Sequence, residues 1–439
     1  MFRRLALFSV SLASQAARVA GASSSVTLAR SKTSDAGDNS AFLARIPRAP
    51  PDAILGLSRE FAMDTNPNKV NLGMGQYRDS EGKPYVLDCV KQASARLPMS
   101  NMDYAPIIGL PGYLESTQRI CFGDELVAAA KDRVATVQTL SGTGALRVAA
   151  AFLKRFGMDV VHVPTPTYAN HPGIFRDAGI AMESYPYYCD TKHELLLDQM
   201  LSELEKLPRN SLVLLHACAH NPTGFDPTPE QWQVIVDVMA DRGHIPFVDM
   251  AYHGFATGDL EHDGCLPRML MRRNFPVLFV AQSFAKNFGL YGQRTGALHV
   301  GCGSAAEKEV VISQLSAIAR AMYSSPPIYG AQIVDTIVRD PELYALWQKE
   351  LHTMATRMST ARQGLYDALI SRGVTRPLKQ IRDGVGMMAQ SGLTKDEVLE
   401  LKEKHHVYLI NSGRIAFSGL TDVNLEYTAN AIGSVMTKK

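Results

Sequence analysis

Hydrophobic and polar positions predict an α/β fold between residues 133 and 301. Short runs of β-branched and apolar residues alternate there with stretches that have helical spacing. The runs are RVATVQTL (133–140), MDVVHV (158–163), SLVLLHA (211–217), IPFVDM (245–250), PVLFVAQ (276–282) and TGALHV (295–300). Continuous apolar strands separated by helices are typical of a largely parallel sheet that is covered on both faces.

One intervening helix has clear start and stop signals. Thr228 is a suitable N-cap, Pro229 suits the first turn, and Gln231 completes a capping box. Gly243 is a typical C-terminal stop. The sequence therefore predicts a helix between Thr228 and Gly243.

The hydrophobic pattern changes after residue 340. Long stretches with helical spacing cover 341–372 and 394–405, and the run VYLI is a short strand candidate. We therefore predict a large domain over residues 82–340 and a smaller α+β domain formed by residues 49–81 and 341–439. A chain of 439 residues is long enough for two such cores.

The N-terminal segment has the composition of a targeting sequence. Residues 1–34 contain no acidic side chain, and their serines and arginines surround apolar residues with amphipathic helical spacing. We predict a mitochondrial transit peptide over residues 1–34, an N-terminal arm over 35–48, and a matrix location. A secretory signal is the alternative, because residues 5–13 form an apolar run after two arginines. Arginine continues beyond this run, which favours the mitochondrion.

Charge and cysteine content exclude several classes of protein. Lys and Arg number 45 against 43 Asp and Glu, so nothing indicates a nucleic-acid partner. No run of about eighteen apolar residues indicates a membrane span. Six scattered cysteines do not resemble a disulfide scaffold. His216 and His220 lie in an apolar stretch without a third ligand at metal spacing, so we predict no metal.

The most informative motif is SFAKNFGLY, which begins at Ser283 directly after an apolar strand. Lys286 stands near a hydroxyl at Ser283 and a guanidinium at Arg294. A lysine that forms a Schiff base with a phosphorylated cofactor needs these neighbours, because hydroxyl and guanidinium groups bind phosphate.

Together with the motifs below, this segment resembles the aspartate aminotransferases of the class I, fold-type I pyridoxal-phosphate enzymes. The resemblance runs from about residue 45 to the C-terminus, and the N-terminal segment points to the mitochondrial type. It implies a mostly parallel seven-stranded sheet, pyridoxal 5′-phosphate as cofactor, and Lys286 as the internal aldimine. The freed amine of Lys286 would then move a proton between the substrate Cα and the cofactor C4′, which requires a pKa below its usual value of about 10.4.

The resemblance also implies a phosphate-binding cup. The motif SGTGALR begins at Ser141 at a predicted strand-to-helix junction, where backbone N–H groups and the positive helix end can bind phosphate. By itself such a motif is a weak signal, since small residues before a helix mostly form a turn. The implied phosphate contacts are Ser141, Gly142, Thr143, Ser283, Arg294 and, from the neighbouring subunit, Tyr104.

Further motifs match residues that hold the cofactor ring. In FVDMAY, the resemblance assigns Asp249 to the protonated pyridine nitrogen and Tyr252 to the cofactor O3′. Asn221, in the turn motif NPTG, shares the O3′ contact. In PTPTYANH, His171 supports the aspartate from behind, and Tyr168 stacks on the ring where the family usually has tryptophan.

Two arginines match the carboxylate-binding residues of the family. Arg414 would bind the substrate α-carboxylate, and Arg320 would reach from the neighbouring subunit to the side-chain carboxylate of aspartate or glutamate. Gly75 would close over the substrate. If Arg320 and Tyr104 both act in trans, the active sites are shared across a homodimer.

The sequence departs from the family pattern around the substrate. Besides Tyr168, the departures are Ser325, Ala416 and the segment GMMAQ around Met388. The expected reaction is the interconversion of L-aspartate and 2-oxoglutarate with oxaloacetate and L-glutamate by a ping-pong mechanism. The departures keep open a broad-range aminotransferase that also uses aromatic amino acids. A catalytically inactive homologue is a further alternative, whereas a nicotinamide-dependent dehydrogenase is discarded because no GxGxxG follows the first strand.

Overall fold

The computed structural model describes residues 42–49, 53–98 and 102–437. The chain divides into two units, residues 1–50 and 51–439. In the first unit the structure describes a single 3₁₀ turn, η2 (Leu43–Arg45). The predicted transit peptide lies outside the described residues. The second unit contains all the elements discussed below.

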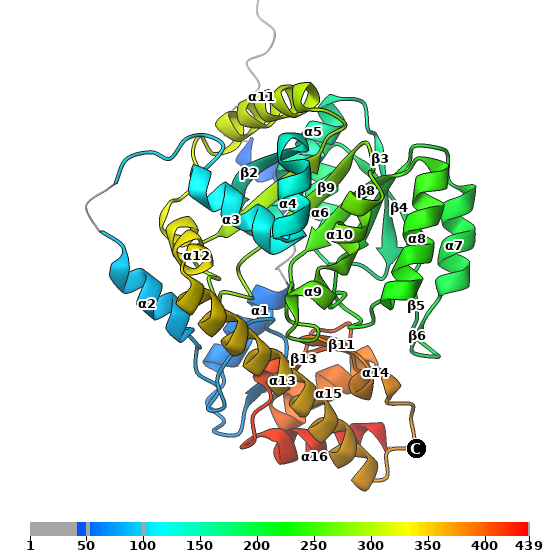
Figure 1. Cartoon of the computed structure of the whole chain (residues 1–439). Coiled ribbons are helices and arrows are strands. Elements are labelled where there is room, and N and C mark those ends of the chain that lie inside the picture. The colour runs from blue at the N-terminus through cyan, green and yellow to red at the C-terminus, as the bar shows by residue number, and fades with distance from the viewer. Residues whose placement is uncertain (1–41, 50–52, 99–101, 438–439) are drawn as a thin grey trace, which may run out of the picture. The chain divides into compact units, whose positions relative to one another are not determined.

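The second unit contains a seven-stranded sheet with the order β2-β10-β9-β8-β7-β3-β4 (Figure 1). The strands are β2 (Val134–Leu140), β3 (Val160–Thr165), β4 (Ala181–Pro186), β7 (Leu212–His216), β8 (Ile245–Met250), β9 (Leu278–Ser283) and β10 (Thr295–Gly301). Only β10 runs antiparallel to its neighbours, and the other pairs are parallel. The prediction of an α/β fold with a mostly parallel sheet is therefore confirmed.

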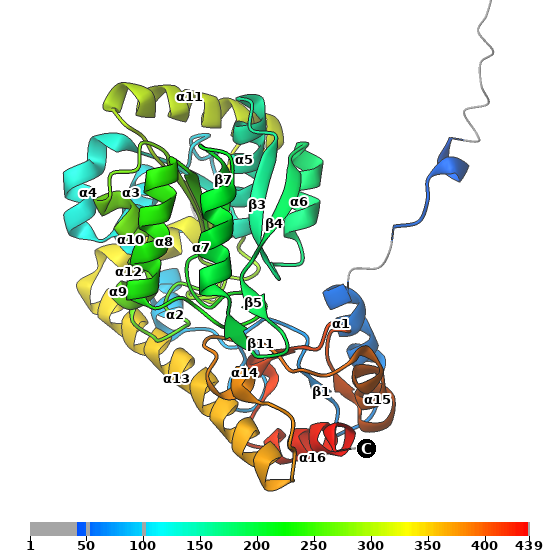
Figure 2. The ribbon, with the colours of Figure 1, turned by 90° about the vertical axis from the view of Figure 1, so that its right-hand side faces the viewer.

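Both faces of the sheet are buried. Successive side chains of a strand point to opposite faces, and neighbouring residues of the central strands pack in two different apolar clusters. In β8, Val248 packs in one apolar cluster and Phe247 in another. The first cluster also receives side chains from α3 (Pro111–Phe122), α7 (Leu197–Lys206), α8 (Pro229–Arg242) and α10 (Cys265–Arg272). The second receives side chains from α5 (Ser141–Arg155), α6 (His171–Ala178) and α11 (Ala305–Met322). Figure 2 shows these helices as two layers around the sheet.

The six strands predicted from the pattern are confirmed, and the seventh was missed. Strand β4 lies at the edge of the sheet, and Glu183 and Ser184 within it are exposed, so it lacks a continuous apolar run. The predicted helix after Thr228 is also confirmed as α8. The Thr228 and Gln231 side chains form the capping box, and Gly243 ends the helix with φ +69°.

A smaller domain packs on the long helix α13 (Pro341–Ser371) and contains α14 (Lys379–Arg382), α15 (Lys395–His405) and α16 (Leu425–Met436). The predicted helical stretches 341–372 and 394–405 are confirmed. Strand β1 (Val70–Asn71) pairs in parallel with β12 (Val407–Tyr408), so early and late parts of the chain share one small sheet. Strand β11 (Met388–Gln390) pairs antiparallel with β13 (Arg414–Ala416). The domain boundaries at residues 82 and 340 stay predictions.

Shorter elements connect these parts. They are α1 (Ala53–Met63), α2 (Asp88–Arg96), α4 (Asp124–Ala130), η3 (Lys131–Arg133), β5 (Tyr188–Cys189), β6 (Glu194–Leu195), α9 (Leu260–Asp263), α12 (Tyr329–Arg339) and η4 (Phe417–Gly419). Within the described ranges, no helix is both long enough and apolar enough to cross a bilayer.

Candidate active site

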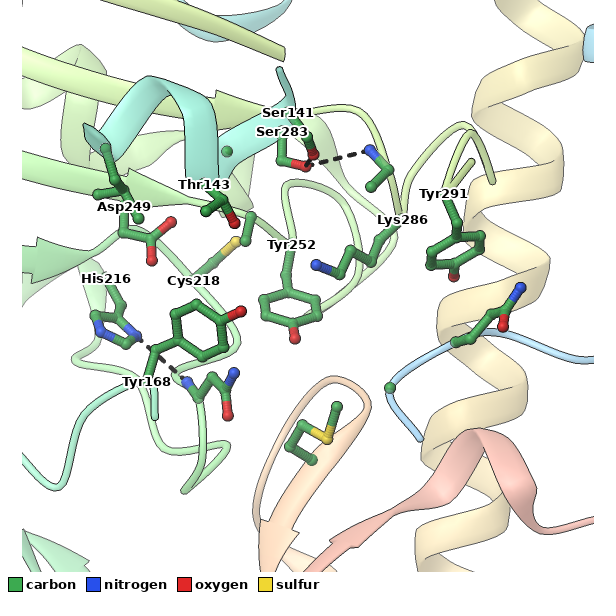
Figure 3. Close-up of a pocket in the computed structure, with 18 of the residues that line it drawn as sticks. Ser141, Thr143, Tyr168, His216, Cys218, Asp249, Tyr252, Ser283, Lys286 and Tyr291 are labelled. Carbon is green, nitrogen blue, oxygen red and sulfur yellow. Dashed lines mark hydrogen bonds between the residues drawn. The ribbon is translucent and has the colours of Figure 1, made fainter. Parts of the chain in front are cut away.

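A cavity of about 410 Å³ lies where β8 and β9 end and the smaller domain begins. It brings together most of the residues singled out from the sequence (Figure 3). These are Gly75, Ser141, Gly142, Thr143, Tyr168, Asn221, Asp249, Tyr252, Ser283, Lys286, Arg294 and Arg414. Residues from the large sheet and from the smaller domain therefore face one another across a single space.

One end of the cavity is built to hold an anion. Ser141 is the first residue of α5 and has φ +62°, a conformation that a serine adopts at a cost. Its Oγ lies 2.9 Å from Ser283 Oγ. A Cβ atom on Gly142 would lie 3.0 Å from Ser283 Cβ, so glycine allows this close approach. The free N–H groups and the positive end of α5 suit a phosphate.

The other end of the cavity holds a buried carboxylate supported by a chain of hydrogen bonds. The backbone N–H of Asn221 donates to His216 Nδ1 at 3.3 Å. His216 Nε2–H therefore donates to Thr167 Oγ1 (3.3 Å), whose hydroxyl donates to His171 Nδ1 (2.8 Å). His171 Nε2–H then donates to Asp249 Oδ2 at 3.2 Å. This series of hydrogen bonds fixes both the tautomer of His171 and the orientation of Asp249.

The electrostatics keep Asp249 ionised. Burial raises the pKa of Asp249, but the His171 hydrogen bond and nearby positive groups, including Lys286, outweigh burial and hold that pKa below its ordinary value. Burial lowers the pKa of His216 far below its ordinary value, which keeps that ring neutral, as the direction of its hydrogen bonds requires.

His171, His216 and Asp249 also form a cluster whose ligand atoms lie within 4.8 Å of one another. The sequence had paired His216 with His220, and their rings stack at 4.2 Å. However, both ring nitrogens of His171 and of His216 are already engaged in the hydrogen bonds above. This arrangement suits a hydrogen-bonded relay better than a metal site, and the absence of a metal stays a prediction.

Lys286 lines the same cavity. Its Nζ is 5.0 Å from the centre of the Tyr252 ring, and Figure 3 shows the side chain extending toward that ring. Burial lowers the pKa of Lys286, and the positive charges of Arg294 and Arg414 lower it further, against the opposite effect of Asp249. Burial raises the pKa of Tyr252 to about 12, so its hydroxyl is a hydrogen-bond donor at neutral pH.

The smaller domain supplies a guanidinium and a soft wall. Arg414 is 5% exposed and donates from Nη2 to the Gly73 carbonyl oxygen at 2.7 Å. Burial lowers the pKa of Arg414. A Cβ atom on Gly75 would lie 2.3 Å from Met388 Cε, so the terminal methyl of Met388 packs directly on this glycine and would have to move for any larger residue. Met74 adds a second flexible thioether to the wall.

Three of the singled-out residues do not line this cavity. His171 contacts Asp249 from behind. Tyr104 is 90% exposed, and Arg320 is exposed and donates to Ser324 Oγ at 2.6 Å. The cavity of a single chain thus contains neither Tyr104 nor Arg320.

The sequence reasoning missed several residues of the cavity. His216 was assessed only as a metal ligand, although it ends a predicted strand and pairs in register with Asp249 of the neighbouring strand. That shared strand end was the available signal. Tyr291, whose hydroxyl accepts a 2.8 Å hydrogen bond from the Tyr77 backbone N–H, and Gln76 gave no comparable signal.

The residues present fit pyridoxal phosphate. The helix end with its two serines suits the phosphate, and the buried carboxylate suits a protonated ring nitrogen. In the same cavity, Lys286 Nζ makes no hydrogen bond to another described residue and faces open space. An amine in this position can react with an aldehyde.

This fold and this cavity define a transferase of the aminotransferase type. The chain belongs to the aminotransferase class I and II family, whose model matches residues 67–432. The cytoplasmic aspartate aminotransferase of Dictyostelium discoideum is 44% identical over 403 residues, which are 91% of this chain and 92% of that protein. A mitochondrial aspartate aminotransferase from Trypanosoma brucei is 47% identical with a TM-score of 0.84, covering 87% of this chain and all of that chain.

An aromatic-amino-acid aminotransferase is also structurally similar. The enzyme from Burkholderia pseudomallei, solved with covalently bound pyridoxal phosphate, is 39% identical with a TM-score of 0.85. The match covers 90% of this chain and 99% of that chain. The similar proteins thus include cytoplasmic and mitochondrial enzymes, and their names give both aspartate and aromatic amino acids as substrates.

Proposed function

We propose that this chain interconverts L-aspartate and 2-oxoglutarate with oxaloacetate and L-glutamate, using pyridoxal 5′-phosphate in a ping-pong transamination. The observation that carries the proposal is the cavity itself. It brings together the amine of Lys286, the buried carboxylate of Asp249 and the guanidinium of Arg414. Aspartate aminotransferases of about 44% identity over about nine-tenths of the chain support the same reaction.

The cofactor supplies an aldehyde that accepts the amino group and a ring that takes up the electrons released at the substrate Cα. Its phosphate would be held at the N-terminus of α5 by Ser141, Gly142, Thr143 and Ser283, assisted by Arg294. Tyr168 would stack on the ring.

Asp249 would hold a proton on the ring nitrogen of the bound cofactor, which would keep the ring electron-poor. The His171 hydrogen bond keeps Asp249 in position and ionised. Tyr252 and Asn221 would donate hydrogen bonds to the ring oxygen. The phenol of Tyr252 is suited to this role because its raised pKa keeps the proton on its oxygen.

Lys286 is the catalytic base. Its lowered pKa gives a larger fraction of free amine near neutral pH than an exposed lysine has. Within the cavity, Nζ would remove the proton from the substrate Cα and carry it toward the neighbouring carbon of the bound cofactor.

Substrate recognition uses two guanidinium groups, because a dicarboxylic amino acid carries two carboxylates. Arg414 binds the α-carboxylate beside Gly75, and Arg320 of a second subunit binds the side-chain carboxylate. The exposure of Arg320 and Tyr104 outside the cavity of their own chain supports a homodimer with shared sites.

Mixing two inactive variants tests the shared site. We expect Lys286→Ala and Arg320→Ala dimers each to be nearly inactive with aspartate. Heterodimers formed from the two should regain activity, because one of their two sites then has both residues. Mixed dimers as inactive as their parents would place both residues in the site of one chain.

Broad substrate range is the second candidate function. The cavity wall contains Tyr168, where the family usually has the larger tryptophan, and the thioethers of Met74 and Met388. Thioethers are flexible and adapt to ligands of different shape. The similarity to aromatic-amino-acid aminotransferases points the same way. Rates with phenylalanine or tyrosine comparable to those with aspartate would favour this candidate, and Arg320 argues against it.

The N-terminal composition supports a mitochondrial location. Fusing residues 1–34 to a fluorescent reporter tests this point directly. We expect import into mitochondria, and secretion or diffuse cytoplasmic fluorescence would contradict it.

A further inference from the structure

Two buried polar atoms of the smaller domain, beside the part of the cavity lined by Met388 and Arg414, lack a hydrogen-bond partner among the described residues. They are the Nε–H of Arg414, a donor, and Oε1 of Gln390, an acceptor. Burying either group without a partner costs free energy. The two residues lie directly opposite each other in the ladder between β11 and β13.

The register brings their side chains together. The Ser391 backbone N–H donates to the Gly413 carbonyl oxygen at 2.9 Å, so Gln390 and Arg414 form the adjacent non-hydrogen-bonded pair. Cβ atoms in such pairs lie about 4.5–5.5 Å apart on the same face of the sheet. Met388, two residues before Gln390, lines the cavity from that face, as Arg414 does.

We propose that Gln390 is a positioning residue for Arg414. Its amide oxygen accepts the Nε–H of Arg414 when the substrate carboxylate is bound. The Gly73 carbonyl oxygen already holds Nη2 at 2.7 Å. With both contacts the plane of the guanidinium is fixed, and its remaining N–H groups face the carboxylate.

A neutral amide suits this position better than other side chains. A carboxylate at position 390 would form an ion pair with Arg414 and compete with the substrate. An apolar side chain would leave the Nε–H unpaired in a water-poor site. This inference rests on the proposed role of Arg414 as the α-carboxylate site, and it gives a role to the glutamine in the GMMAQ segment.

Because every amino-acid substrate carries an α-carboxylate, Gln390 should affect all substrates equally. We would load the full chain and a Gln390→Met variant with pyridoxal phosphate and titrate each with L-aspartate and L-phenylalanine. The apparent Kd should rise about tenfold for both substrates, with kcat close to wild type. The thermal midpoint should not fall, since methionine has similar length and removes the buried amide oxygen that lacks a partner.

The control is Gln363→Met, which makes the same change at an exposed position of α13. It should leave both Kd values unchanged. A second variant, Gln390→Glu, should weaken substrate binding more than Gln390→Met because its charge occupies Arg414.

An unchanged Kd in Gln390→Met, a change with aspartate alone, or wild-type affinity in Gln390→Glu would overturn the proposal. A wild-type protein that responds to no amino acid would instead contradict the proposed function. The failure of either idea is therefore distinguishable from failure of the other.

Discussion

Replacing Asp249 with asparagine tests the buried charge on which the proposed chemistry depends. The substitution preserves shape and removes the negative charge. Asp249 is 7% exposed, so water screens its electrostatic interactions only weakly. An ion pair on the protein surface is screened far more and contributes about 0–1 kcal/mol of stability. Breaking a buried pair by removing one charged partner costs about 3–5 kcal/mol.

If the substitution removes about 3–5 kcal/mol of stabilisation from the transition state, the rate falls by about 150- to 5,000-fold. The assay is the half-reaction with L-aspartate, followed by the absorbance of the bound cofactor. We expect the loss in the rate constant, with little change in cofactor affinity, because the phosphate contacts at Ser141 and Ser283 lie at the other end of the cavity.

The matched control is Asp263→Asn, which alters another buried aspartate outside this cavity. Asp263 accepts hydrogen bonds from Ala256 and Thr257, so the control should lose stability and keep its activity per folded enzyme. A loss below tenfold in Asp249→Asn, or an equal loss in the control, would refute the reasoning.

Three further predictions follow from single side chains. Lys286→Ala should retain the cofactor noncovalently and lose turnover by at least about a thousandfold, and near-normal rates would rule out Lys286 as the base. Arg320→Ala should lower kcat/KM for aspartate at least about tenfold more than for phenylalanine, since only aspartate has a side-chain carboxylate; equal losses would contradict its selectivity. Burial raises the pKa of Asp226 from 3.8 to about 6, so its contribution to stability is present below pH 4 and is lost as the pH rises through 6. Compared with Asp226→Asn, the wild type should therefore lose up to about 3 kcal/mol of unfolding free energy between pH 4 and 7, measured by urea titration. A difference in unfolding free energy between the two proteins that does not vary with pH would contradict the raised pKa.

The central strands were predictable because they are buried on both faces and therefore appear as uninterrupted apolar runs. Edge strand β4 was not, because Glu183 and neighbouring residues face solvent, and an exposed edge needs no apolar run. The two-residue strands β1 and β12 are too short for any periodicity to define them.

Most cavity residues were accessible through family motifs. Those around Ser141, Asp249 and Ser283 end a strand or start a helix of the large sheet, whereas Arg414 begins strand β13 of the smaller domain. His216 was missed because its function depends on a neighbour in the adjacent strand, which the sequence does not display. The proposed role of Gln390 could not be derived from the GMMAQ motif for a related reason, because its cross-strand partner Arg414 lies 24 residues further along the chain. Side-chain direction and register appear only in the folded chain.

The most direct test of the central claim is an absorbance titration of the purified protein loaded with pyridoxal phosphate. Aspartate, phenylalanine or alanine would be added without a keto acid, and the visible absorbance of the bound cofactor would be followed. We predict conversion by aspartate at far lower concentration than by the other two. An equal response to phenylalanine would contradict the dicarboxylate preference, and a protein that forms no lysine-dependent absorbance band with the cofactor would contradict the assignment of Lys286.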